Sequence, residues 1–271
     1  MRINAHNLCE HFFCCQLYLC IMSLWVLDPK ELWFPYKNEM DGDRVAIGAD
    51  LHWVRVLKGF EKGCYLNYAE GEDIQWYSPE QRAVIFPHLQ KKFDDWEAPE
   101  GWSFQWDQHF QAIMMGCARP HEEKPWLHPD VQSVYLHLYE QGYAHALSVL
   151  HNGELVGGLM GVAVGRVFFG MSMYHEESNS SKYALEYLIQ FLKEKKWKVL
   201  DVQKLTPFLS KMGAVEIQRD RFLDLLKEQM KFRTVAGNWS EDRSWLQKDP
   251  YPLSAEWPKG FNLQDPCPFL V

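Results

Sequence analysis

The feature of this sequence that most restricts its fold is a run of three apolar segments between residues 144 and 175. "AHALSVL" and "ELVGGLMGVAV" are joined by His151-Asn152-Gly153, and Asn-Gly supplies the positive φ values of a tight β-hairpin. "RVFFGMSMY" follows after Gly165. Three consecutive strands are therefore predicted. The preceding "HPDVQSVYLHLYEQG" is predicted to be a helix, because its apolar residues recur on one helical face.

Further elements surround these strands. A helix is predicted from about Ser181 to Trp197, followed by the strand "KVLDVQ" and by the helical segments "FLSKMG" and "RDRFLDLLKEQMKF". Upstream, the apolar spacing of "WDQHFQAIMMGCA" predicts a helix over residues 106–118. Before that, turn-rich sequence surrounds the helical pattern "DLHWVRVLKGFEKG".

The order of these elements indicates an α+β fold of the acetyltransferase (GNAT-like) type. We expect a small N-terminal α+β domain over residues 22–95 and a GNAT-like catalytic domain over residues 96–235. Residues 236–271 form a Pro- and Trp-containing tail, which either packs over the N-terminal domain or remains loose. Residues 1–21 are interpreted as an upstream extension that need not be ordered.

Composition limits the kinds of partner. A formal net charge of −8 argues against a protein that coats nucleic acid by bulk electrostatics, so any nucleic-acid partner must be held locally. The cysteines lack CxxC spacing and the histidines lack HExxH, which predicts no metal site and a reducing cytoplasm. The apolar segment "HFFCCQLYLCIMSLWVL" is too short to span a membrane and has no cleavage site, so we expect neither membrane insertion nor a signal peptide.

Several motifs occur in one order over some two hundred residues: "GWSFQWD", "CARPHEEKPWLHPDV", "YEQGYAHALSV", "NGELVGGLMGVAVGRVFFGMSM", "SNSSKYAL" and "LDVQKL". Together they resemble the leucyl/phenylalanyl-tRNA–protein transferase family. The resemblance implies an aminoacyltransferase that moves Leu or Phe from the 3′ end of aminoacyl-tRNA to the N-terminal amine of a protein. The acceptor typically begins with Arg or Lys and is thereby marked for degradation in an N-degron pathway. The resemblance implies no cofactor, and we expect a cytoplasmic monomer.

The resemblance also assigns candidate site residues. Asp201 and Gln203 match the family's strand motif, in which the carboxylate orients the amide as an acceptor for the attacking amine's proton. Residues i and i+2 of a strand share a face, so these side chains are expected to touch at a pocket-facing strand end. From the residues alone, a polar pair that caps a helix is the favoured interpretation.

Other residues fall where the family binds its substrates. Trp126 matches the tryptophan that stacks on the terminal adenosine of the tRNA. The positions that line the family's pocket for the leucyl or phenylalanyl side chain are here Leu159, Phe168 and Ser172. Each of these four residues could instead be ordinary packing.

The match breaks at Met171, because the family has a glutamate between the glycine and the serine of this motif. Met171 is therefore expected to pack where the family keeps a charge, unless Glu176 or Glu177 compensates. The other departures are Tyr65-Leu66-Asn67 in place of FPW, Thr206 in place of an asparagine, and a helix after "FPHL" with Lys91 and Lys92 but then Asp94, Asp95 and Glu97. Two alternatives thus stay open: a diverged transferase with another donor or acceptor, and an inactive module that binds tRNA or an N-degron.

Overall fold

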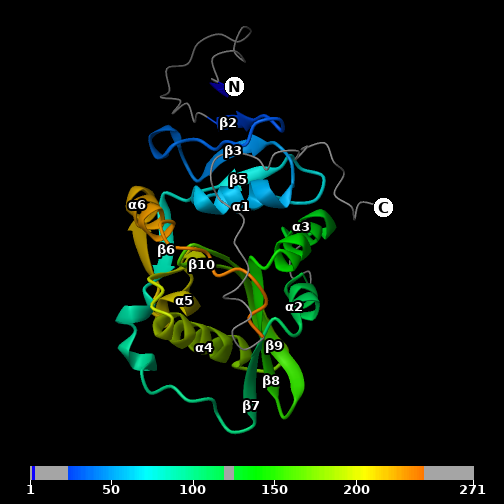
Figure 1. Ribbon diagram of the computed structural model, residues 1–271, viewed down its shortest axis with the longest axis vertical. Helices are drawn as coiled ribbons and strands as arrows, with labels where there is room; N and C mark the ends of the chain where they lie inside the picture. Colours follow the sequence, from blue (N-terminus) through cyan, green and yellow to red (C-terminus); the bar gives the residue numbers. More distant parts are fainter. Residues whose placement is uncertain (1, 4–23, 119–124, 241–271) are drawn as a thin grey trace, which may run out of the picture.

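A computed structural model of the chain describes residues 2–3, 24–118 and 125–240 (Figure 1). Within these residues the fold is mixed α+β, with two sheets and six α-helices. The predicted α+β class is confirmed. None of the helices in these ranges has the length and apolar character needed to cross a membrane. The expected extension at residues 1–21 lies almost wholly outside the described residues.

The smaller sheet belongs to the N-terminal part of the chain and has the strand order β1-β2-β3-β5-β4. Its strands are β1 (Arg2–Ile3), β2 (Leu24–Leu27), β3 (Arg44–Gly48), β4 (Tyr65–Leu66) and β5 (Gln75–Tyr77). The predicted helix in this part is α1 (Trp53–Glu61), which buries one apolar face. The short 3-10 turn η2 (Lys37–Glu39) precedes β3.

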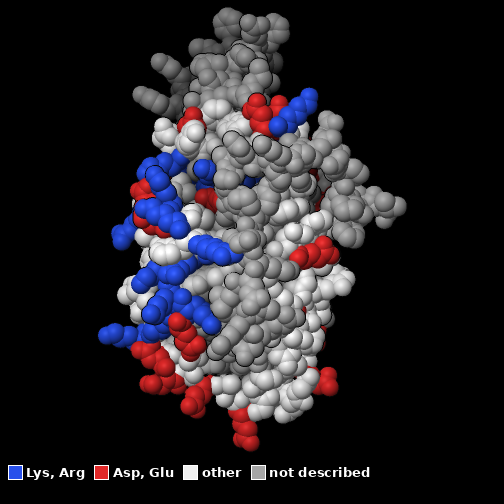
Figure 2. All heavy atoms as spheres, in the orientation of Figure 1, with Lys and Arg blue, Asp and Glu red and all other residues white. Residues whose placement is uncertain are grey.

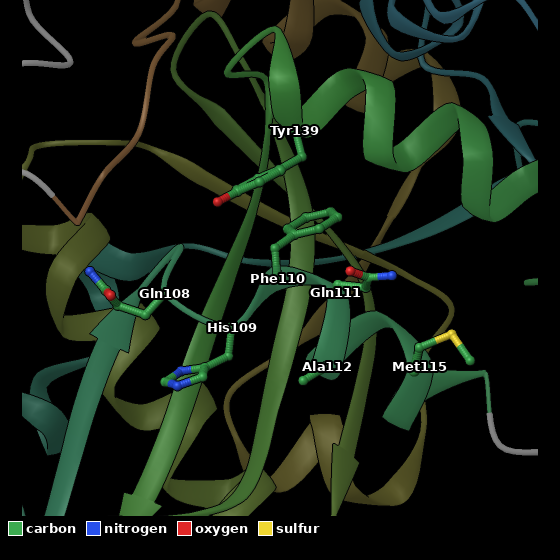
Figure 3. A pocket seen from close by; sticks show the side chains of 7 residues that line it. All are labelled: Gln108, His109, Phe110, Gln111, Ala112, Met115 and Tyr139. Carbon is green, nitrogen blue, oxygen red and sulfur yellow. The ribbon is translucent and has the colours of Figure 1, made fainter. Parts of the chain in front are cut away.

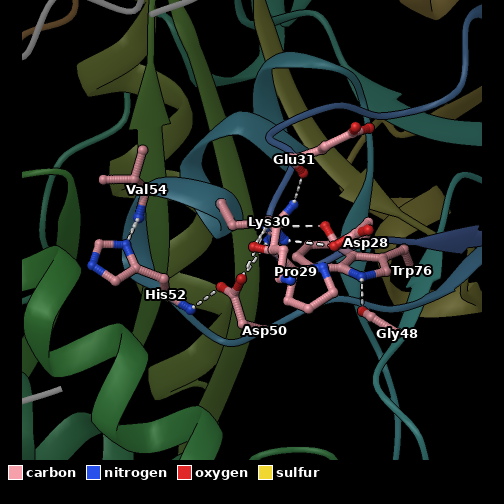
Figure 4. Close-up of polar contacts among 10 residues, drawn as sticks. Asp28, Pro29, Lys30, Glu31, Gly48, Asp50, His52, Val54 and Trp76 are labelled. Carbon is pink, nitrogen blue, oxygen red and sulfur yellow. Dashed lines mark hydrogen bonds and ion pairs between the residues drawn. The ribbon is translucent and has the colours of Figure 1, made fainter. Parts of the chain in front are cut away.

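A buried arginine on α1 holds the N-terminal part together. Arg55 donates to the backbone oxygen of Glu31 at 2.8 Å and to the carboxylate of Asp50 at 3.0 Å. Figure 4 shows the polar contacts of this part, with His52 beside Asp50. Nδ1 of His52 accepts a hydrogen bond from the Val54 N–H at 3.2 Å and so caps α1. Burial lowers the pKa of the His52 ring, which favours the neutral form that can accept this bond.

The larger sheet has the strand order β12-β6-β11-β10-β9-β8-β7. Its strands are β6 (Gln81–Ile85), β7 (Trp102–Trp106), β8 (Ala144–His151), β9 (Glu154–Val164), β10 (Val167–His175), β11 (Val199–Gln203) and β12 (Val215–Gln218). β10 and β11 run parallel, and the other neighbours are antiparallel. β6 precedes residue 95 and yet belongs to this sheet; the division of the chain near residue 95 stays a prediction.

The predicted strand meander and most predicted helices are confirmed. Asn152 and Gly153 turn between β8 and β9 with φ of 51° and 89°, as the hairpin requires. The helices that follow α1 are α2 (Phe110–Cys117), α3 (Pro129–Glu140), α4 (Ser180–Glu194), α5 (Pro207–Lys211) and α6 (Arg219–Gln229). The sheet has a core on each face: α2 and α3 pack on one side, and α4 packs on the other.

The helix expected over residues 106–118 begins too early in that prediction. Trp102–Trp106 form strand β7, and α2 starts only at Phe110. A strand forms here because Trp102, Phe104 and Trp106 alternate with polar residues and so share one face of the sheet. Those three rings pack on aromatic side chains of α4.

The helix expected after "FPHL", which ends at Leu89, is also absent within the described residues. The segment forms two 3-10 turns instead, η3 (Pro87–Leu89) and η4 (Lys91–Phe93). The side chain of Lys92 donates to the backbone oxygen of Lys211, and Asp94 forms an ion pair with Lys193. The segment is thus fastened to α4 and α5 by its own charges.

The start of the C-terminal tail follows neither expected alternative. Trp239 is buried against the face of the large sheet that carries α4, and its ring stacks on His145 at 3.7 Å. Its backbone N–H donates to the carboxylate of Asp107, which also accepts from the Ala146 N–H and lies 2.9 Å from the His145 ring. Residues 241–271 lie outside the described residues.

Candidate active site

A small cavity lies where β10 and β11 part. Their parallel pairing is limited to Val167–Phe169 against Val199–Asp201. Each strand then has an irregularity toward its other neighbour, β10 after Gly170 and β11 after Asp201. Strands that lose register next to a bulge change direction, and this often occurs at functional sites. The parting leaves a cavity of about 140 Å³.

The lining of this cavity is mostly apolar. It consists of Leu159, Met160, Gly170, Met171, Ser172, Met173, Leu185, Leu188, Leu200, Val202, Gln203 and Leu209. The leucines come from β9, β11, α4 and α5, so four elements close around one small space. Among the lining residues, only Ser172 and Gln203 carry polar side chains.

Four of the residues predicted from the sequence therefore meet at one place: Leu159, Met171, Ser172 and Gln203. Phe168 does not join them, because it is fully buried and packs against Trp106 and Trp239 instead. Phe168 belongs to the hydrophobic core between the large sheet and α4 and is not part of the cavity lining.

Gln203 has an unusual backbone and a fixed amide. Its φ is 64°, a left-handed conformation that non-glycine residues seldom adopt. Its side-chain Nε2 donates to the carbonyl oxygen of Gly170 at 3.3 Å and lies 3.2 Å from Sδ of Met171. Because both of these neighbours are acceptors, the amide nitrogen is turned toward them. The carbonyl Oε1 is consequently the group left for a substrate.

Asp201 is placed differently from the prediction. It is fully buried, and its carboxylate forms a two-pronged ion pair with the guanidinium of Arg82, at 2.9 Å and 2.6 Å. Oδ1 also accepts the backbone N–H of Gln203 at 2.9 Å. No hydrogen bond joins the two side chains in the described structure. The assumption of a regular strand fails here because of the irregularity between residues 201 and 203.

Sequence reasoning missed Arg82. The signal was present, since a lone arginine at the start of "RAVIF" stands in an otherwise apolar strand. A buried charge is costly unless it is paired, and Asp201 pairs with Arg82. We therefore expect Asp201→Ala to destabilise the fold, because the substitution would leave a buried cation without its counter-ion.

Ser172 and Cys117 form a second polar contact at the cavity. Burial raises the pKa of the Cys117 thiol to about 12, and its hydrogen bond with Ser172 offsets only part of this effect. A thiol held in its protonated form is a poor nucleophile at neutral pH. These two residues therefore suit packing and polar contact better than covalent catalysis.

Trp126 lies outside the lining of the cavity. It is half-buried, and its ring meets Tyr135 edge-on with a centroid distance of 5.9 Å. The Tyr135 hydroxyl and both ring nitrogens of nearby His128 are buried without a hydrogen-bond partner among the described residues. Trp126 thus stands beside polar groups that a ligand or water could satisfy.

Glu176 and Glu177, the two acids close to Met171 in the chain, are not part of the cavity lining. Glu177 lies 2.9 Å from the ring of His151, which in turn stacks on Trp102. Glu176 is exposed and contributes its backbone N–H to the oxygen of Val156. Met171 therefore remains uncompensated by either acid. The departure at Thr206 also has a local explanation, because its hydroxyl caps α5.

Positive charge gathers on one face of the molecule. Figure 2 shows Lys and Arg side chains over the region where Figure 1 places α6, α5 and part of α4. The exposed basic residues in these helices or close to them in the chain include Lys195, Lys196, Lys204, Lys211, Arg221 and Lys227. We call this set the basic strip. Lys204 directly follows Gln203, and Lys211 is on the same helix as Leu209, so the strip borders the cavity.

A second hollow is larger and more open, with a volume of about 550 Å³. It is lined by Gln108, His109, Phe110, Gln111, Ala112, Met115 and Tyr139 (Figure 3). Phe110 and Tyr139 stack on each other, and the His109 ring lies 3.2 Å from the Ser148 hydroxyl. This hollow contains none of the residues predicted from the sequence. Among the described residues, no group of three or more His, Cys, Asp or Glu side chains is placed to hold a metal ion.

Comparison with known proteins defines the class and the family. The family model described as leucyl/phenylalanyl-tRNA protein transferase matches residues 84–227. Leucyl/phenylalanyl-tRNA–protein transferases from Desulfatibacillum aliphaticivorans and Syntrophus aciditrophicus are 36% and 35% identical to this chain. The first alignment covers 72% of this chain and 87% of the relative, and the second covers 80% and 93%. The relative from Shewanella sediminis is 35% identical over 75% of this chain and 88% of its own length.

Among solved structures, a conserved protein of unknown function from Staphylococcus epidermidis has a TM-score of 0.38 and 12% identity over 65% of this chain and 68% of its own. That likeness is too low to define the fold. The relatives in sequence are decisive. The protein is an enzyme of the aminoacyltransferase class. The chain belongs to the leucyl/phenylalanyl-tRNA–protein transferase family, as its motifs predicted.

Proposed function

We propose that this protein moves a leucyl or phenylalanyl group from aminoacyl-tRNA to the N-terminal amine of an acceptor protein that begins with Arg or Lys. The cavity between β10 and β11 would hold the aminoacyl side chain. The product is an extended polypeptide whose new N-terminus serves as a degradation signal. The enzyme would act as a cytoplasmic monomer without a soluble cofactor.

One observation carries this proposal: a small apolar cavity has a single amide at its edge. Leucines from four elements surround the space. Gln203 lies beside it with its Nε2 turned to Gly170 and Met171, and its carbonyl oxygen accepts no hydrogen bond from any described residue. An apolar side chain gains free energy when it enters such a space, at roughly 25 cal/mol per Å² of apolar surface removed from water. A polar or charged aminoacyl group would lose its hydration there without compensation.

The chemistry needs little more than alignment. The acceptor amine attacks the ester carbonyl carbon of the aminoacyl-tRNA, a C–N bond forms, and the C–O bond to the ribose breaks. The amine loses a proton, and the departing ribose oxygen gains one. Oε1 of Gln203 would accept a hydrogen bond from the amine N–H and so direct its lone pair at the carbonyl. Holding both reactants together can itself supply several kcal/mol of the barrier.

The tRNA would approach along the basic strip. Its lysines and arginines can contact phosphates of the acceptor stem, and each such contact releases counterions and adds salt dependence. The terminal adenosine would stack on Trp126, where an aromatic face is worth roughly 1–3 kcal/mol per base. The strip would also offset the acidic residues Asp94, Asp95 and Glu97 that follow η4.

We further propose that the large sheet and its helices form an acetyltransferase-type fold. The order of a three-strand meander, a long helix and a parallel fourth strand supports it. So does the site, because the two parallel strands part where the reacting groups would meet.

A second candidate function is transfer with a different donor or acceptor. Met171 favours it, because the cavity lining contains no carboxylate that could bind a cationic group. On this alternative, the acceptor would begin with an uncharged residue. Otherwise the amine of the aminoacyl group would bind without a carboxylate partner.

The test is a transfer assay with purified full-length protein. Labelled Leu-tRNA, Phe-tRNA and a polar control such as Ser-tRNA are each offered with peptides that begin with Arg, Lys or Ala. The proposal predicts product with Leu or Phe and an Arg or Lys peptide, and little with Ser-tRNA. Product only with the Ala peptide would favour the second candidate, and no product with any pair would refute the first.

A further inference from the structure

We propose that Arg82 is a positioning residue for Gln203: the buried Arg82–Asp201 ion pair fixes the left-handed backbone from which Gln203 presents its amide. This inference rests on the proposed function in that it gives Gln203 its role in transfer. In this account Asp201 does not polarise the Gln203 amide. It holds the backbone N–H of Gln203 in place instead.

Arg82 is itself held from several sides. It lies on β6, where its side chain is 1% exposed, and a further nitrogen of its guanidinium donates to the backbone oxygen of Gly63 at 3.2 Å. The rings of Tyr65 and Phe222 lie 4.9 Å and 4.6 Å from the guanidinium carbon. These contacts fix the plane of the guanidinium, so its two N–H groups that point at Asp201 can meet a carboxylate in only one orientation.

The carboxylate of Asp201 transmits that orientation to the backbone. Oδ2 accepts from Arg82, and Oδ1 accepts from both Arg82 and the backbone N–H of Gln203. Gln203 needs this contact, because its φ of 64° breaks the regular pairing of β11 with β6. Sparsely populated backbone conformations persist only where their surroundings determine them. The ion pair is the determinant next to this residue.

The side chain of Gln203 points to the other neighbour. Its Nε2 contacts Gly170 and Met171 on β10, away from the carboxylate that binds its backbone. The charge of Asp201 is matched by Arg82, so little of it remains to polarise an amide that it does not touch. Asp201 therefore fixes the backbone position of Gln203. Gly170 and Met171 fix the orientation of its side-chain amide.

A double-mutant cycle separates the two roles. Asp201→Asn alone places an amide against a buried cation, and Arg82→Gln alone leaves a buried carboxylate. We expect each to lower kcat for transfer at least tenfold with little change in KM for aminoacyl-tRNA. In the double variant both groups are neutral amides that can bond each other, and the asparagine oxygen can still accept the Gln203 N–H. We expect the double variant to recover at least fivefold over Asp201→Asn.

A chemical relay predicts the opposite, because without the carboxylate no change at Arg82 can restore activity. A double variant no more active than Asp201→Asn therefore overturns the proposal. The matched control is Arg55→Gln, which removes another fully buried arginine with a carboxylate partner, Asp50, in the N-terminal part. It should lower the melting temperature and leave kcat unchanged, with all assays run well below the lowest melting temperature.

A second measurement needs no activity and so stands if the proposed function fails. Arg82→Lys keeps the charge but loses the fork, and it is the variant most certain to fold. Amide hydrogen exchange in peptides that cover residues 199–205 should be at least tenfold faster in Arg82→Lys than in the wild-type protein, and unchanged in Arg55→Gln. Equal exchange in the wild-type and Arg82→Lys proteins overturns the inference, whatever the transfer assay gives.

Discussion

Met171→Glu restores the charge that the family keeps at this position, and the structure sets its expected cost. Met171 is half-buried against the core, and its sulfur lies 3.2 Å from Nε2 of Gln203. A carboxylate there would gain a charge-assisted hydrogen bond from that amide, worth about 1.5–3 kcal/mol. It would also lose most of its water among leucine and valine side chains, which costs several kcal/mol. We expect a net loss of about 1–3 kcal/mol in the free energy of unfolding at pH 8.

The sign of the pH dependence tests this reasoning. Burial penalises the charged form, so the carboxyl should bind its proton more readily in the folded state than in the unfolded state. The variant should therefore be closest to wild type near pH 4.5 and weakest at pH 8. Met171→Gln is the matched control, because it keeps the shape and has no charge. Urea unfolding of both variants at the two pH values measures the effect, and identical pH dependence in both would refute it. Transfer should stay within about threefold of wild type, because the carboxylate still holds the Gln203 amide.

Three further outcomes are expected. The pKa of His52 is lowered by burial, so its cap on α1 stabilises the protein above about pH 6.5 and is lost as the pH falls below that value. Melting curves of His52→Asn should therefore show a smaller loss of stability between neutral and acidic pH than the wild-type protein. The same pH profile in both proteins would contradict this role of His52. Trp126→Ala should raise KM for aminoacyl-tRNA about tenfold, as expected for one lost stacking contact, with the melting temperature nearly unchanged; an unaltered KM would exclude the stacking role. Trp239→Ala should cost about 3–5 kcal/mol in urea unfolding, since the ring is buried among five aromatic side chains; a loss below about 1 kcal/mol would count against it.

Local sequence signals predicted the parts of the fold that depend on local chemistry. Asn152-Gly153 set the hairpin, and the helical spacing of "HPDVQSVYLHLYEQG" predicted α3. The error at residues 106–118 arose because a pattern typical of a strand is followed closely by a pattern typical of a helix. "WSFQW" alternates as a strand, but it runs directly into apolar residues with helical spacing. The partners of the strand lie on α4, some eighty residues away, so the sequence around residue 106 alone could not decide it.

The site was predicted in part for a similar reason. The resemblance pointed to Leu159, Met171, Ser172 and Gln203, and the structure brings these four residues together at one cavity. The resemblance did not reveal that Asp201 faces Arg82, a residue 119 positions earlier in the chain. An i and i+2 argument assumes regular strand geometry, and the irregularity after Asp201 invalidates it. Phe168 lies one residue from the end of the paired segment and on the buried side, a detail that depends on the register of β10 with β11.

The measurement that tests the central claim most directly is the single-turnover rate of Gln203→Ala. Saturating Phe-tRNA and an Arg-starting peptide isolate the transfer step from substrate binding. Because Oε1 is the acceptor proposed to direct the amine, the rate should fall by about 10²-fold or more, with the melting temperature within a few degrees of wild type. A rate within about threefold of wild type would contradict the assignment of this cavity and its amide as the site of aminoacyl transfer.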